Sequence, residues 1–434
     1  MLFRTTCAAL TLTALAPAWA DHHLADAVAK DWEENLKDLY LYFHQNPELS
    51  FREFETSKRL AKELRSLGYK VTTGVGQTGV VALMKNGDGP TIMVRADMDG
   101  LPVKEDSGLT YMSKATQEDI DGVVKPVMHA CGHDVHITSL VGTARQMMDR
   151  KDEWSGTLVL IGQPAEERIS GARAMLEDGL YERFPKPDYA LALHVGSDIP
   201  AGRIIVPREN AYASSDSVDI TVYGIGGHGA SPHETVDPVL IASQIVVSLQ
   251  SVVSRTIAPK AAGVITVGSI HGGSKHNVIG EEVHLQLTVR SLDPDVRMEL
   301  LDGIDRIAAG TAMTFGVPED KMPKVVRSQT ETTPPTNNHP ATAERVETAI
   351  VASMGSEVLI NIPDEGMGAE DFAYFVEPDL GVKGVYFAVG GGFEQDLGSP
   401  RPHHSPVFRV DPGPAVRNGT EAMTAAAIAL FAGE

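Results

Sequence analysis

The sequence of 434 residues has only 2 cysteines, Cys7 and Cys131, which is too few for a fold stabilised by disulfides. Positive charge is also scarce, because 37 Lys and Arg residues stand against 58 Asp and Glu residues, giving a formal net charge of −21. This balance argues against nucleic acid or an anionic membrane as a partner. After residue 20 no apolar run is long enough to span a bilayer, and we find no short repeats.

The N-terminus has the pattern of a secretory signal peptide. Arg4 supplies the positive charge, a short apolar core extends from residue 7 to residue 16, and residues 18–20 (Ala-Trp-Ala) fit a small-residue cleavage site. We therefore expect residues 1–20 to be removed and the mature protein to be secreted or periplasmic, with no membrane attachment afterwards. Cys131 would then be the single thiol of the mature chain.

Short β-branched or aliphatic segments alternate with helical patterns in the first half of the chain. This alternation predicts an α/β fold with a mixed, largely parallel sheet, and in such sheets functional sites lie beyond the carboxyl ends of the strands. The predicted strands are Tyr69–Thr72, Val80–Met84, Thr91–Arg95, Thr157–Ile161 and Tyr189–Leu193, with predicted helices at 26–67, His136–Met148 and Gly171–Asp178.

The middle of the chain follows a different order, β-α-β-β-α-β, which is typical of a ferredoxin-like α+β layer. The strand and helix alternation resumes after it, so the last segment completes the first domain. We therefore predict a catalytic domain in two parts, 21–211 and 328–434, with an inserted domain at 212–327.

Cys131 lies in the densest group of reactive side chains in the sequence. The nine residues from Met128 to His136 contain three histidines, this thiol and a carboxylate. A cysteine without a disulfide partner, with His133 two residues later, indicates a metal ligand or a nucleophile, and either makes the protein an enzyme. The simpler interpretation is a buried structural thiol, which these neighbours disfavour.

Further candidate ligands follow predicted strands or lie in a loop. Glu166 and Glu167 follow one strand, His194 ends another, and His403 and His404 lie in a loop. Taken singly, paired glutamates usually face solvent, a histidine at a strand end is usually a core residue, and a loop histidine is usually exposed.

Taken together, these residues indicate a metal site. Thiolate, imidazole and carboxylate ligands are typical of a transition-metal site and not of calcium or magnesium. Adjacent glutamates in an extended loop point in different directions, so one could bind metal while the other acts as general base on water. The candidate ligands are Cys131, His133, Glu167, His194 and one of His403 and His404.

Two other motifs are weaker. Residues 224–229 match G-x-G-x-x-G after a strand, but Pro232 and Pro238 interrupt the next segment, so no helix begins where a dinucleotide would need one. A Cys131 nucleophile with His133 as its base would require a tight loop, because residues at i and i+2 do not face each other on a helix.

Five motifs that occur in order across most of the mature chain resemble one known family. As a linked set they are similar to the amidohydrolase branch of the aminoacylase/carboxypeptidase metallopeptidases, which includes hippurate hydrolases, N-acyl-amino-acid amidohydrolases and auxin-conjugate hydrolases. The motifs are Arg95–Val103, Met128–Asp134, Gln163–Glu167, Gly226–His233 and Met367–Phe372.

The resemblance implies a role for each site residue. Two divalent transition-metal ions (Zn, Mn, Co or Ni) would be held, with Cys131 bridging them and Glu166 as general base on the bridging water. Asp99 would orient a ligand, Asn277 and Arg290 would bind substrate, and the inserted domain would serve as a lid or in a homodimer. Its His228 would steady the oxyanion, in the partner's site. The implied metal ligands are Cys131, His133, Glu167, His194 and His404.

The sequence thus predicts a dinuclear metallohydrolase that cleaves the amide bond of N-acyl-amino acids. A dipeptidase or carboxypeptidase acting on unblocked peptides is the alternative at the same site. A metal-bound binding protein without catalysis is disfavoured by Glu166, because a pure binder needs no base beside the metal.

Overall fold

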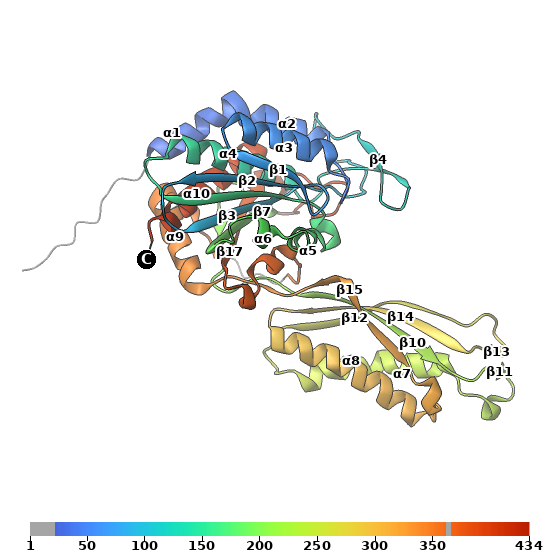
Figure 1. The fold of residues 1–434 in the computed structure, drawn as a ribbon. Coiled ribbons are helices and arrows are strands. Elements are labelled where there is room, and N and C mark those ends of the chain that lie inside the picture. Colours follow the sequence, from blue (N-terminus) through green and yellow to red (C-terminus); the bar gives the residue numbers. More distant parts are fainter. Residues whose placement is uncertain (1–21, 362–365, 434) are drawn as a thin grey trace, which may run out of the picture.

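The structure is a computed structural model that describes residues 22–361 and 366–433. The predicted signal peptide lies outside these described residues. The chain forms a large α/β body, from one side of which a smaller, elongated α+β body extends (Figure 1).

The large body is built on a seven-stranded sheet in the order β1-β2-β6-β3-β7-β17-β8. The central strands β6, β3, β7 and β17 are parallel, whereas β1, β2 and β8 pair antiparallel with their neighbours. This confirms the α/β class with a mixed, largely parallel sheet. The strands are β1 (Lys70–Val75), β2 (Gly79–Asn86), β3 (Thr91–Asp97), β6 (Gly156–Gln163), β7 (Tyr189–Pro200), β8 (Ile204–Ile205) and β17 (Lys383–Gly392).

Alternate side chains of these strands enter two different cores, because successive residues of a strand point to opposite faces. In β2, Val80 and Ala82 pack under the larger helical layer, whereas Val81 packs on the other face. The larger layer contains α1 (His22–Asp31), η1 (Trp32–Leu36), α2 (Lys37–Gln45), α3 (Phe54–Ser66), α4 (His133–Asp149), α9 (Pro340–Met354) and α10 (Pro412–Phe431). The smaller layer contains α5 (Gly171–Glu177), α6 (Leu180–Arg183) and η7 (Asp371–Val376).

The smaller body has a four-stranded antiparallel sheet in the order β12-β14-β10-β15, covered on one face by α7 and α8. Its chain order is β-α-β-β-α-β, as predicted for a ferredoxin-like layer; the boundaries 212 and 327 stay predictions. The elements are β10 (Ser215–Tyr223), α7 (Pro238–Ser251), η4 (Val252–Thr256), β12 (Gly263–Gly272), β14 (Glu282–Ser291), α8 (Pro294–Thr314) and β15 (Lys324–Thr333).

Both helices of this layer begin at an aspartate followed by proline. The side chains of Asp237 and Asp293 accept hydrogen bonds from the first free backbone amides of α7 and α8. The helix Pro238–Thr256 is apolar enough by composition to cross a membrane, with a mean hydropathy of 1.3. Its buried residues Ile241, Ile245 and Leu249 pack on the sheet, as they do in the core helix of a folded layer.

Three short strand pairs complete the structure. β11 and β13 lie at the far tip of the smaller body (Figure 1). β4 pairs with β5, and β9 pairs with β16. They are β4 (Thr116–Glu118), β5 (Val124–Pro126), β9 (Asn210–Tyr212), β11 (Gly227–His228), β13 (Val278–Ile279) and β16 (Thr336–Asn337).

Candidate metal centre and substrate cleft

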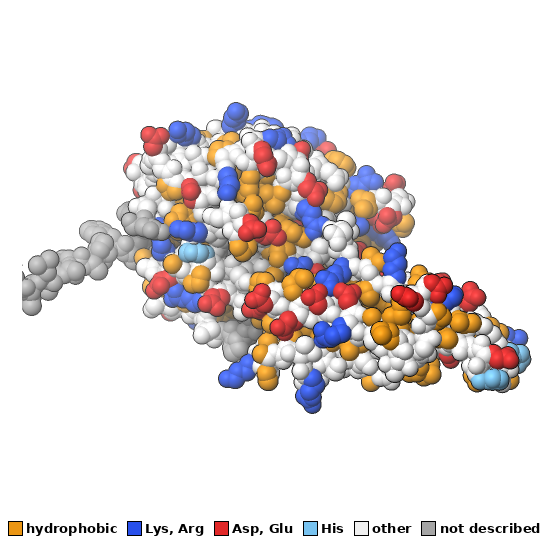
Figure 2. Space-filling model, turned by 60° about the horizontal axis from the view of Figure 1, so that its bottom comes forward, with side chains coloured by type: hydrophobic (Ala, Val, Ile, Leu, Met, Phe, Trp, Pro, Cys, Tyr) orange, Lys and Arg blue, Asp and Glu red, His pale blue; other side chains and the backbone are white. Residues whose placement is uncertain are grey.

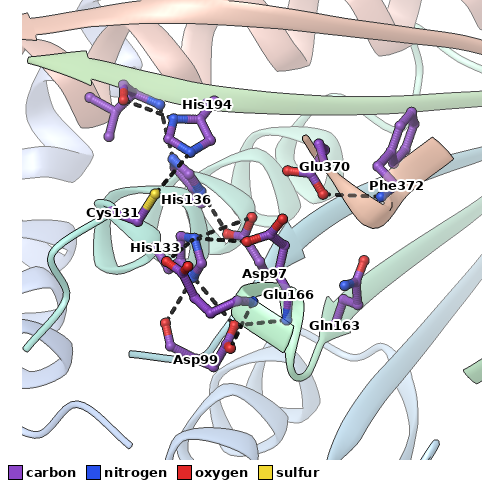
Figure 3. Close-up of polar contacts among 12 residues, drawn as sticks. Asp97, Asp99, Cys131, His133, His136, Gln163, Glu166, His194, Glu370 and Phe372 are labelled. Carbon is purple, nitrogen blue, oxygen red and sulfur yellow. Dashed lines mark hydrogen bonds and ion pairs between the residues drawn. The ribbon is translucent and has the colours of Figure 1, made fainter. Parts of the chain in front are cut away.

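The candidate ligands lie at the start of α4, in the turn after β6, within β7 and in the loop at 403–404. Figure 3 shows Cys131, His133 and His194. His194 does not end its strand as predicted, because β7 continues to Pro200. Cys131 and His133 flank Gly132, whose φ of +86° lies in the left-handed region. A Cβ atom at Gly132 would lie 2.3 Å from Val195 Cγ1, so the tight turn that presents both side chains requires glycine.

His133 is fully buried and oriented by the backbone. Its Nδ1 donates to the carbonyl oxygen of Asp99 at 2.8 Å, which leaves Nε2 with the lone pair. Nε2 lies 3.9 Å from a carboxylate oxygen of Glu166 and 3.8 Å from one of Glu167. Within the described structure neither His133 Nε2 nor Glu167 Oε1 has a hydrogen-bond partner, although both are buried.

The other three ligands lie beside this pair. Cys131 Sγ is 3.4 Å from His194 Nε2, and His404 Nε2 is 3.3 Å from Glu167 Oε2. Ligand atoms of Cys131, Glu167 and His404 lie within 4.8 Å of one another, as do those of Cys131, His133 and His194. The structure therefore brings together the five residues that the sequence suggested as ligands, and Cys131 is common to both groups.

Glu166 and Glu167 differ from expectation in their backbone. They lie in a 3-10 turn (η2, Glu166–Arg168) and not in an extended loop, between Ala165 and Ile169 in left-handed conformations. The carboxylate of Asp99 holds this turn by accepting both glutamate amides at 3.1 Å. Both glutamate side chains consequently face His133 instead of pointing apart.

Negative charge is in excess at this centre. Burial, followed by the neighbouring carboxylates, raises the pKa of Glu166 well above its usual value, and burial raises that of Glu167 to about 8. Burial would lower the pKa of His133, but Asp97 and Asp99 raise it to about 10. Without another cation, protons must neutralise these carboxylates.

The donor set therefore fits divalent metal ions. A metal would satisfy His133 Nε2 and Glu167 Oε1 and would offset the excess carboxylates, whereas burial keeps His194 neutral by lowering its pKa well below the usual value. One thiolate, three imidazoles and a carboxylate favour a transition metal over calcium or magnesium.

Sequence reasoning gave no role to Asp97 or His136, which lie beside the ligands in the structure (Figure 3). His136 Nδ1 donates to Asp97 at 2.6 Å and its Nε2 accepts the amide of Val195 at 2.9 Å, so His136 has no free nitrogen for a metal. Arg95, also fully buried, donates to Asp97 at 2.8 Å and to Glu370 at 2.7 Å. All four lie in or beside motifs noted in the sequence, but their partners are distant along the chain.

A cavity of about 930 Å³ opens onto the centre and reaches the junction of the two bodies. Arg290 lines it from β14, together with Cys131, Glu166 and His194. The guanidinium is half-buried, and among the described residues its single hydrogen bond is from Nε to Thr288 Oγ1 at 3.3 Å. Asp293, three residues later in the chain, uses its side chain to cap α8.

His228 and Asn277 are not brought to this cavity within one chain. Both are exposed, in β11 and just before β13, at the far tip of the smaller body. Histidines gather at this tip in Figure 2. Their predicted roles at the site therefore require a second copy of the chain and stay predictions.

Comparison with known proteins shows the family. Residues 93–428 match the model for peptidase family M20/M25/M40, and the chain belongs to this family. It is 37% identical over 386 residues to thermostable carboxypeptidase 2 of Saccharolobus solfataricus (88% of this chain, 92% of the relative). It is 36% identical over 351 residues to hippurate hydrolase of Campylobacter jejuni (80% of this chain, 86% of the relative).

Solved structures of proteins from the same family have a similar fold. A Bacillus subtilis protein described as a dinuclear metal-binding peptidase of the M20 family has a TM-score of 0.76 and 27% identity, covering 93% of this chain and 99% of that one. Family and site together identify the chain as a metal-dependent hydrolase of amide or peptide bonds, which confirms the predicted enzyme class.

Proposed function

We propose that this enzyme hydrolyses N-acyl-amino acids, with hippurate-like compounds as model substrates. The observation that carries this proposal is the position of Arg290 in the same cavity as the candidate ligands. A guanidinium with unused N–H groups binds a carboxylate through two parallel hydrogen bonds, which fixes orientation as well as adding energy. A substrate with a free carboxylate next to the scissile amide could place the carboxylate on Arg290 and the amide at the candidate metal centre. The identity to a hippurate hydrolase supports the same substrate class.

The proposed mechanism assigns proton transfer to Glu166. When bound, two divalent ions would polarise the scissile carbonyl and lower the pKa of the attacking water. Glu166 would then take a proton from this water and pass it to the leaving amine, the role of a general base followed by a general acid. Glu167 would hold metal together with His404, and Asp99 keeps the glutamate turn in place.

The complete site would be shared between two protomers. We propose a homodimer in which the tip that carries His228 and Asn277 reaches the partner's cavity. His228 would donate to the developing oxyanion and Asn277 would bind substrate. The glycines at 224, 226, 227 and 229 keep this loop thin enough to enter a cleft. We further propose that the protein acts in the periplasm or outside the cell after removal of residues 1–20.

A panel of N-acyl-amino acids and matched unblocked dipeptides tests the substrate class with metal-reconstituted enzyme. The proposal predicts faster release of the amino acid from hippurate-like substrates. Preference for unblocked peptides would instead support a carboxypeptidase or dipeptidase, an alternative that the identity to thermostable carboxypeptidase 2 favours. The variant Glu166→Gln is the matched negative control for both activities.

A further inference from the structure

The backbone of Val195, in β7, connects three imidazole rings. Its amide donates to His136 Nε2 at 2.9 Å, and its carbonyl oxygen accepts from His194 Nδ1 at 2.9 Å and from His403 Nε2 at 3.0 Å. A carbonyl oxygen only accepts, so both of the latter nitrogens carry hydrogen. In the neutral ring of His194, Nε2 therefore holds the lone pair, and this atom lies 3.4 Å from Cys131 Sγ.

The ring of His403 is itself fixed between two other rings. It packs on the buried Phe408 with ring centroids 4.8 Å apart, and it makes an edge contact with the ring of His194, with centroids 5.3 Å apart and an interplanar angle of 66°. His403 thus shares a carbonyl acceptor with His194 and also contacts its ring. Rotation of His194 away from Cys131 would disturb both contacts.

His403 also precedes the candidate ligand His404. His404 has a φ of +61°, a left-handed conformation that a residue other than glycine holds only when its surroundings impose it. Its amide donates to the carbonyl oxygen of Ala130 at 2.8 Å, and its Nε2 faces Glu167 at 3.3 Å. The bond from His403 to Val195 anchors this loop immediately before the left-handed residue.

We propose that His403 is a positioning residue shared by two metal ligands. The Val195 carbonyl, to which both rings donate, fixes the His194 tautomer that presents Nε2 beside Cys131. His403 holds the orientation of the His194 ring by direct contact, and through the loop it sets His404 over Glu167. This inference rests on the proposed metal centre. It gives His403 a role distinct from coordination: its Nε2 donates to a carbonyl oxygen, and among the described residues the groups of close ligand atoms contain His404 and not His403.

Two substitutions of His403 distinguish the effect of its hydrogen bond to Val195 from the effect of its packing against Phe408. His403→Phe keeps an aromatic ring against Phe408 but has no donor, whereas His403→Gln retains an N–H group near the place of Nε2. For each variant, zinc affinity is measured by chelator competition, and the Co²⁺ absorption spectrum reports on ligand geometry. Thermal unfolding of the metal-free protein reports on the fold alone.

We expect His403→Phe to weaken binding of zinc by about 10- to 100-fold and to alter the Co²⁺ spectrum, the usual effect of losing a partner of a metal ligand. His403→Gln should recover most of this loss, and both metal-free variants should unfold near the wild-type temperature.

Wild-type affinity and spectrum in His403→Phe would overturn the proposal, and so would equal losses in the Phe and Gln variants. His194→Ala tests the centre separately. If that variant still binds two ions as tightly as wild type, the assignment of the metal centre fails, and not only the role of His403.

Discussion

Glu166 and Glu167 are neighbours in sequence but have different surroundings. The carboxylate of Glu166 lies among Glu370 and Asp371, and that of Glu167 lies beside Cys131 and His404. Both are buried and face His133, so the backbone turn held by Asp99 determines which oxygen meets which partner. The separation of proton transfer from metal binding follows from this arrangement.

Glu166→Gln should retain both metal ions and lose activity by about 10²–10⁴-fold, because an amide cannot take the proton from water. Glu167→Gln should instead lower the metal content, since it removes a ligand charge. Metal analysis together with kcat measures both effects. Equal loss of metal in the two variants would show that this division of roles is wrong.

Arg290→Ala should lower kcat/KM for N-acyl-amino acids by roughly 10- to 100-fold, the effect of losing one charge-assisted hydrogen-bonded pair. Metal content and thermal stability should stay near wild type, because among the described residues the hydrogen bond of Arg290 is to Thr288 and not to a candidate ligand.

The matched control changes the substrate instead of the enzyme. Conversion of the substrate carboxylate to a primary amide should lower kcat/KM of wild type about as much as Arg290→Ala does. The same conversion should lower kcat/KM of the Arg290→Ala variant only slightly further. If wild type hydrolyses acid and amide equally well, Arg290 does not bind the carboxylate.

At the scale of elements, a buried charge cluster joins α2 to α4. His44 bonds Asp134 at 2.7 Å and Glu105 at 3.2 Å. Burial opposes a charge on His44, but these hydrogen bonds raise its pKa from 6.5 to about 9. The same contacts lower the pKa values of Asp134 and Glu105 despite their burial. The cluster thus ties α4, the helix that carries His133, to α2 within the larger helical layer.

The sign of this shift predicts how stability varies with pH. Because the pKa of His44 is raised in the folded protein, its charged form stabilises the fold. This stabilisation is fully present below pH 6.5 and is lost as pH rises through about 9; the pKa shift corresponds to about 3 kcal/mol of unfolding free energy. Urea unfolding of wild type and His44→Gln should therefore give free energies that converge between pH 6.5 and pH 9.5. A difference that is constant over this range would contradict a charged His44.

Periodicity was enough to predict most strands of the large sheet and the order of elements in the smaller body, because the alternation of buried and exposed residues is a local property of the sequence. It did not predict the short edge strand β8. It could not predict that β6 lies between β2 and β3. It also could not place the partners of Arg95, since Arg95 and Glu370 are 275 residues apart and meet only when the sheet has formed.

The candidate site divides in the same way. Residue type and position suggested Cys131, His133, Glu167 and His194 as ligands, but they did not distinguish His403 from His404. The family resemblance was needed for that choice, because both histidines lie in one loop. His136 and His403 both bond to the backbone of Val195, one to its amide and the other to its carbonyl. The apolar side chain of Val195 gives no indication of this role in the sequence. The extended conformation expected for Glu166 and Glu167 was wrong, because two left-handed residues close the turn.

At the scale of the whole molecule, the far tip of the smaller body is exposed and remote from the cavity of its own chain. If His228 acts in a partner's site, mixing inactive His228→Ala with inactive Glu166→Gln protomers should restore activity, since each heterodimer contains one intact site. The donated hydrogen bond is of a type worth about 2.7–4 kcal/mol. Assays on purified heterodimers that remain inactive would exclude action across a dimer.

The central claim is that two divalent ions held by Cys131, His133, Glu167, His194 and His404 are required for amide hydrolysis. The most direct test is to remove metal completely and then titrate Zn²⁺, Mn²⁺, Co²⁺ or Ni²⁺ while following hydrolysis of a hippurate-like substrate. Activity should vanish with the metal and return in full at two ions per chain, which should lie about 3.5–4 Å apart. Full activity in the metal-free protein would contradict the claim.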